Sequence, residues 1–193
     1  MNGPNHHSYR RVDLRRRGLV VHAVMRKVFC LWLLGCSASW AAEPSDLDFV
    51  VASSLPRELG EYLRASTGHE SYALASWMNP YYIQADFNGD GRADVAVLVR
   101  EKATGKGGIL IVHFGVNEHF VVGAGNSFDK GRDSFSGMDA WHVQPRGVVE
   151  RSAYVEGEPP SLLGDALLVI KTEASSGLVY WTGSGYAWYQ QGD

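Results

Sequence analysis

The sequence predicts a mostly β domain of the α+β class: an antiparallel sheet, strongly curved or folded into a sandwich or partial barrel, with one N-terminal helix. Two observations predict this class. Short apolar runs rich in β-branched and aromatic residues recur from residue 81 onward, and polar, glycine-containing turns separate them. A single stretch with helical spacing precedes these runs, which favours a helix lying on one face or end of the sheet.

The helix is predicted within residues 54–63 and ends near Ser66-Thr67-Gly68. Pro56 is tolerated in a first helical turn, and Ser53 or Ser54 is a candidate cap. Four apolar residues recur at helical spacing and form one stripe: Leu55, Leu59, Tyr62 and Leu63. Such a stripe usually packs into a core, so we expect the helix to cover a face of the sheet.

About seven to nine strands are predicted, because turns of a few residues join antiparallel neighbours. The clearest strands are residues 81–85, 94–99, 108–114, 118–123, 140–143, 165–171, 178–181 and 186–190.

The closing hairpins carry a run of aromatic residues: Tyr180, Trp181, Tyr186, Trp188 and Tyr189. Tyr and Trp are common on surfaces that bind proteins or carbohydrates. Alternate strand residues face opposite sides, so Tyr186, Trp188 and Gln190 share one face and Ala187 and Tyr189 share the other. We predict that these aromatic residues face the core rather than form a binding platform.

The N-terminal region has the features of a signal peptide over residues 25–41. Met25 opens Arg26-Lys27, an apolar run at residues 28–34, and a stretch of small residues. We interpret residues 1–24 as an upstream over-extension of the reading frame and residues 42–193 as one β-rich domain. The apolar run is too short for a permanent membrane span.

The sequence is compatible with two alternative processing sites. Ser39 and Ala41 have the small side chains that signal peptidase accepts, which would leave a mature chain beginning at Ala42. Alternatively, Leu33-Leu34-Gly35-Cys36 resembles a bacterial lipobox, in which Cys36 is acylated. The first site implies a periplasmic or secreted protein, and the second implies an outer-membrane lipoprotein.

The predicted mature domain is acidic. The chain has 18 Lys or Arg residues and 21 Asp or Glu residues. Residues 1–36 contain seven of the basic residues and one of the acidic residues. The remainder therefore has 11 basic and 20 acidic residues, a formal charge of −9. Such a domain repels nucleic acid and attracts cations. It has no cysteine beyond Cys36, so no disulfide can form inside it.

The loop at residues 86–94 has the pattern of a calcium site. Oxygen-bearing side chains occupy positions 1, 3, 5 and 9, and Gly91 at position 6 permits a sharp turn. The carbonyl of Arg92 is placed to be a further ligand. The predicted metal ligands are therefore Asp86, Asn88, Asp90, Arg92 and Asp94. Position 12 is Val97 instead of the Glu of an EF-hand, and a β-branched run follows, which indicates a strand.

A loop of this kind, which closes with Asp94 and enters a strand, resembles the calcium loop of FG-GAP and VCBS-like secreted repeat domains, such as integrin α-chain propellers. The resemblance covers about ten to fourteen residues in a single copy and implies a bound Ca²⁺. The C-terminal segments at residues 164–169, 176–181 and 189–193 also look like uncharacterised bacterial secreted proteins, which implies no function.

The sequence contains only weak matches to known catalytic residue patterns. The four histidines of the predicted domain, His69, His113, His119 and His142, have no zinc-site spacing, although His113 and His119 could meet across adjacent strands. No serine lies in a nucleophile elbow. Three acids in one polar region could act as acid and base, as in glycosidases: Asp129, Asp133 and Asp139.

The sequence therefore predicts an exported, non-enzymatic calcium-binding domain. Its metal would be structural, and its exposed face or loops would bind an envelope protein or glycan. The alternative is a small envelope hydrolase that uses the acidic loop Asp129–Asp139.

Overall fold

The computed structural model describes residues 53–153 and 158–192. The contacts within the chain group its residues into two compact units, residues 1–41 and residues 42–193. Every described residue belongs to the second unit. The predicted signal peptide, both processing sites and Cys36 lie outside the described residues. None of the helical segments in the described part of the chain has the length and hydrophobicity of a membrane span.

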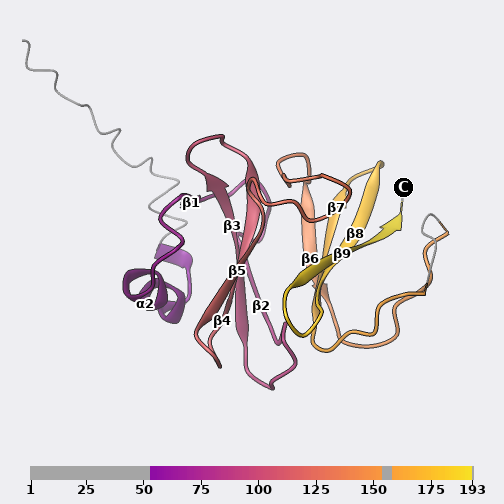
Figure 1. The fold of residues 1–193 in the computed structure, drawn as a ribbon, viewed down its shortest axis with the longest axis horizontal. Helices are drawn as coiled ribbons and strands as arrows, with labels where there is room; N and C mark the ends of the chain where they lie inside the picture. The colour runs from indigo at the N-terminus through magenta and orange to yellow at the C-terminus, as the bar shows by residue number, and fades with distance from the viewer. Residues whose placement is uncertain (1–52, 154–157, 193) are drawn as a thin grey trace, which may run out of the picture. The chain divides into compact units, whose positions relative to one another are not determined.

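The described part of the chain forms two antiparallel sheets and helix α2, as Figure 1 shows. Strand β3 is the centre of the first sheet, with β4 and then β5 on one side. Strands β1 and β2 share its other edge, because β2 pairs with the first half of β3 and β1 with the second half. The strands are β1 (Tyr72–Leu74), β2 (Tyr82–Ala85), β3 (Asp94–Glu101), β4 (Gly107–His113) and β5 (Glu118–Gly123).

The second sheet is a meander in which each strand pairs with the next along the chain. Its strands are β6 (Ala140–Gln144), β7 (Ala166–Lys171), β8 (Ser175–Trp181) and β9 (Tyr186–Gly192). The prediction of a mostly β fold with antiparallel strands is confirmed. Of the three expected sheet arrangements, the structure has two sheets that share a core, and the described strands form no closed barrel.

The shared core takes alternate residues from strands of both sheets. Ala96 and Leu98 of β3 pack in one cluster with Leu167 and Val169 of β7. The neighbouring residues Val95, Val97 and Val99 face the other side of β3 and belong to a second cluster. Because β3 is covered on both faces, its sequence is a continuous apolar run rather than an alternating one.

Helix α2 (Arg57–Ala65) covers the outer face of the first sheet, as predicted. Its Leu59 is fully buried among residues of β3 and β4. The predicted serine cap is wrong: the N-cap is Pro56, without a side-chain cap hydrogen bond. Proline has already fixed φ near the helical value, so the helix can begin without a capping side chain. At the other end, the N–H of Ser66 donates to the carbonyl of Tyr62 at 2.9 Å.

Four of the five aromatic residues of the closing hairpins pack against cores, as predicted: Tyr180, Tyr186, Trp188 and Tyr189. Tyr186 and Trp188 pack on the core between the sheets, whereas Tyr189 is buried in a third cluster on the outer face of the second sheet. The indole N–H of Trp188 donates to Oε1 of Gln190 at 3.1 Å, which confirms that these two residues share a face. Trp181 differs, because it contacts Phe120 near the surface.

Candidate metal centre

The predicted metal loop connects β2 to β3. The strands pair up to Ala85 and Asp94, so residues 86–93 form the hairpin connection. Gly91 has φ of 84°, a left-handed conformation that a side chain rarely adopts. This turn allows the loop to curl back on itself.

The polar side chains of the loop bond to its own backbone. One carboxylate oxygen of Asp86 accepts from Gly89 N at 2.8 Å, and the other accepts from Gly91 N at 3.0 Å. Oδ1 of Asn88 accepts from Asp90 N at 3.0 Å. Oδ1 of Asp90 accepts from Arg92 N at 2.8 Å. These bonds hold the side-chain oxygens of Asp86, Asn88 and Asp90 against the backbone of the curled loop, although Asp90 is itself exposed.

Asp94 closes the loop and is completely buried. Its Oδ2 accepts from Phe87 N at 3.1 Å and from Asn88 N at 3.3 Å, whereas its Oδ1 has no hydrogen-bond partner. Burial, together with the negative charges of Asp90 and Asp86, raises the pKa of Asp94 to about 6. A buried carboxylate oxygen without a hydrogen-bond partner is energetically unfavourable in its ionised form.

The nearest basic side chain does not neutralise Asp94. Nε2 of His113 lies 4.0 Å from Oδ2 of Asp94 and 2.6 Å from the hydroxyl of Tyr186. Burial lowers the pKa of His113, so its imidazole is neutral at pH 7. The loop therefore holds three carboxylates close to a buried strand end without a fixed positive charge beside Asp94.

The described residues do not form a preformed cluster of strong metal ligands. Across residues 53–153 and 158–192, no three His, Cys, Asp or Glu side chains come together in an arrangement that could hold a metal ion. The predicted ligand set also includes an amide and a backbone carbonyl, from Asn88 and Arg92. A cation at this site would compete with the loop's own amide groups for the oxygens of Asp86 and Asp90.

Two segments distant in sequence support the loop. A Cβ at Gly115, in the turn between β4 and β5, would collide with Oδ2 of Asp90. On another side, the N–H of Asp165 donates to the carbonyl of Asp86 at 2.7 Å. Sequence reasoning missed both contacts, because Gly115 looks like an ordinary turn residue and Asp165 is expected only to begin the strand at residues 165–171.

The acidic residues of the hydrolase alternative each have a separate partner. Asp129 pairs with Arg132, Asp133 pairs with Lys106, and Asp139 pairs with Lys171. The bonds from Lys171 and Thr172 lower the pKa of Asp139 to about 2. A general acid needs a raised pKa, so this arrangement does not favour Asp139 in that role.

The expectation that the side chains of His113 and His119 could meet across adjacent strands is wrong. His119 lies opposite Val112 in the register of β4 and β5, and its Nδ1 is 2.8 Å from the hydroxyl of Tyr62 on α2. His113 instead contacts Tyr186 on the inner side of the sheet. The two imidazoles therefore lie on opposite faces.

Comparison of the chain with protein-family models, with curated proteins and with solved structures finds no match. The similarity of residues 86–94 to FG-GAP loops therefore rests on those residues alone.

Proposed function

We propose that this protein is an exported calcium-binding domain. Its cation stabilises the β2–β3 loop, and its surface binds a protein or glycan of the cell envelope. One observation carries the calcium proposal: Oδ1 of Asp94 is buried without a partner, in a loop that also contains Asp86 and Asp90. A divalent cation would provide that missing partner and would offset the mutual repulsion of the three carboxylates.

The ligand types favour calcium over other cations. Asp86, Asn88, Asp90 and Asp94 offer side-chain oxygens, and Arg92 offers its carbonyl. Oxygen ligands in a flexible loop suit Ca²⁺, and water can complete its coordination shell. Mg²⁺ requires a tighter octahedron and loses its water reluctantly, so it should bind more weakly.

The position of the loop supports a structural role for the ion. Asp94 is both the last predicted ligand and the first residue of β3, the central strand of the first sheet. The loop also bonds to the segment before β7 through Asp86 and Asp165. A cation held here would fix the start of β3 and the connection between the two sheets.

The test is thermal unfolding of residues 42–193 in calcium and in chelator. Exported proteins meet high calcium, so a dissociation constant on the order of 10⁻⁴ to 10⁻³ M is sufficient. At a hundredfold excess over this constant, the cation adds about 2.7 kcal/mol to the free energy of unfolding. This gain corresponds to a rise of several degrees in melting temperature.

Asp90→Ala should abolish the calcium response. It removes one ligand and one acceptor for Arg92 N, but it also relieves repulsion among the carboxylates, so stability in chelator should change little. Glu58→Ala on α2 removes the same charge at an exposed position and should keep the full response. If the parent melts equally in calcium and chelator, and calorimetry detects no binding at millimolar calcium, the calcium proposal is wrong.

A further inference from the structure

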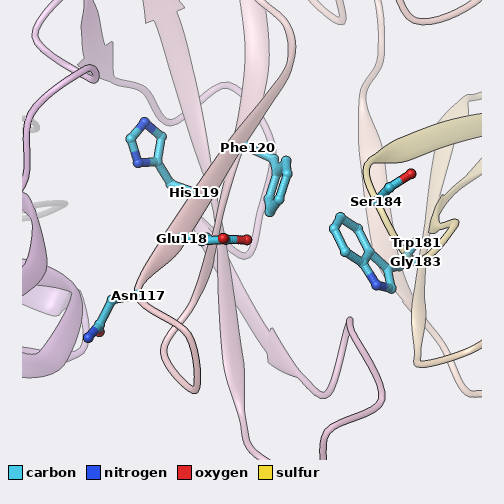
Figure 2. A pocket seen from close by; sticks show the side chains of 7 residues that line it. All are labelled: Asn117, Glu118, His119, Phe120, Trp181, Gly183 and Ser184. Atoms are coloured by element: carbon cyan, nitrogen blue, oxygen red, sulfur yellow. The ribbon is translucent and has the colours of Figure 1, made fainter.

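An open cleft lies between the turn that precedes β5 and the turn between β8 and β9. Its volume is about 550 Å³, which is within the usual size range of small-molecule sites. Figure 2 shows its lining side chains: Asn117, Glu118, His119, Phe120, Trp181, Gly183 and Ser184. Glu118 and Phe120 share one face of β5, the face toward the other hairpin, whereas His119 extends to the opposite side.

The floor of the cleft is aromatic. The rings of Phe120 and Trp181 meet edge to face with centroids 4.9 Å apart, and both residues are partly exposed. Behind them, His113 and Tyr186 pack against the Trp181 ring at centroid distances of 4.9 and 5.2 Å. This backing holds the indole in place, so the exposed part of Trp181 is a rigid apolar surface.

The rim of the cleft is polar and has unused hydrogen-bonding capacity. Asn117, Glu118 and Ser184 are exposed. Their side chains form no hydrogen bond or ion pair to other described residues, and neither does the indole N–H of Trp181. Figure 2 shows the Asn117 side chain pointing away from Trp181, on the side of His119. The rim therefore offers a carboxylate, a hydroxyl and an indole N–H group beside an aromatic surface.

We propose that this cleft binds a neutral carbohydrate. A sugar ring presents C–H groups that pack on an aromatic face, and its hydroxyls both donate and accept hydrogen bonds, as this rim requires. An anionic ligand is disfavoured, because Glu118 lines the cleft and no Lys or Arg does. An organic cation would satisfy Glu118 but would leave the indole N–H of Trp181 and the hydroxyl of Ser184 unused.

This inference deepens the envelope-binding part of the proposed function, but it does not depend on the calcium site. The experiment is amide-resolved NMR titration of residues 42–193 with cellobiose, maltose and N,N′-diacetylchitobiose, each in calcium and in chelator. We expect at least one disaccharide to bind saturably, with a dissociation constant of about 0.1 to 10 mM. The shifted amides should be those of residues 117–120 and 181–184. Sugar binding in chelator as well would support the cleft even if the calcium proposal fails.

Variants at the rim make the test specific. Glu118→Gln should weaken binding by about tenfold, since it removes a charge-assisted acceptor, and Ser184→Ala should weaken it less. Both residues are exposed, so neither change should impair folding. Trp181→Phe keeps a ring on the floor but removes the indole N–H, and it should also weaken binding. Glu58→Gln on α2, outside the cleft, is the charge-matched control and should bind like the parent.

Three outcomes would overturn the proposal. The first is the absence of saturable shifts with all three disaccharides. The second is sugar binding that Glu118→Gln and Trp181→Phe leave unchanged, which would place the sugar elsewhere. The third is saturable binding of benzyltrimethylammonium at these residues when no disaccharide binds there, which would assign the cleft to organic cations.

Discussion

Asp94 combines deep burial with negatively charged neighbours. Two backbone amides satisfy one of its oxygens, and nothing in the described structure satisfies the other. Burial is the main cause of its raised pKa, and Asp90 and Asp86 add to it. The pKa of a buried acid rises in this way when the ionised form lacks a compensating charge. The same residue is therefore a predicted calcium ligand and a source of instability when calcium is absent.

The raised pKa of Asp94 predicts a pH dependence in chelator. Its pKa of about 6 in the folded protein exceeds the ordinary value of 3.8, so the folded state retains a proton that the unfolded chain releases between these values. The contribution of this group to stability is therefore greatest below about pH 4 and falls as the pH rises to about 6. The fall should be on the order of 2–3 kcal/mol.

Asp94→Asn removes the titrating group and should remove this fall. The test is urea unfolding of the parent and the variant in chelator across pH 4 to 7. The difference between the two pH profiles isolates residue 94 from the other titrating groups. Profiles that run parallel would show that the pKa of Asp94 is not raised.

At the scale of elements, the two faces of β3 explain what helix α2 contributes to the first sheet. One face of β3 packs toward the second sheet, and the other would be exposed without α2. Leu59 is the buried centre of the helix stripe, and Leu55, Tyr62 and Leu63 pack partly buried around it. Helices of this length depend on such packing more than on intrinsic propensity.

Leu59→Ala should reduce the free energy of unfolding by about 2–5 kcal/mol, because it removes a fully buried side chain and leaves a cavity between α2 and the sheet. Val148→Ala is a suitable control, since Val148 is 94% exposed and its truncation should change stability by no more than about 0.5 kcal/mol. Urea unfolding measures both variants. Equal midpoints for the two would mean that α2 does not contribute to the core.

At the scale of the whole molecule, the two hairpin ends that line the cleft come from different sheets. The turn before β5 also carries Gly115, which lies against Asp90 of the metal loop. The turn after β8 carries Gly183, which is close to Leu163 in the segment that supports the same loop. The candidate metal loop and the candidate sugar cleft are therefore neighbours that share supporting segments.

Export is a prediction for the whole chain, based on the sequence of residues 25–41 and the acidic charge of the remainder. Mass spectrometry of the protein from its native host should find a mature chain that begins at Ala42 or at a lipid-modified Cys36. A lipid-modified Cys36 would indicate membrane anchoring, and Ala42 would indicate a periplasmic or secreted protein. Recovery of an intact chain from Met25 in the cytoplasm would contradict export.

Sequence by itself determined the local features of this protein. Strand β5 has the predicted bounds, and most other strands differ by one to three residues at an end. This success has a physical reason: alternation, turn residues and helical spacing are short-range properties of a chain. The spacing of the loop oxygens at residues 86–94 is also local, so the candidate ligands could be named without a structure.

Tertiary structure alone decided the long-range features. Strand β1 was not predicted, because it has three residues and its pairing with the far half of β3 is its defining contact. The contacts of Gly115 and Asp165 with the metal loop and the meeting of Phe120 with Trp181 join segments that lie far apart in sequence. Such contacts depend on strand register and on how the two sheets pack, which no short window of sequence encodes.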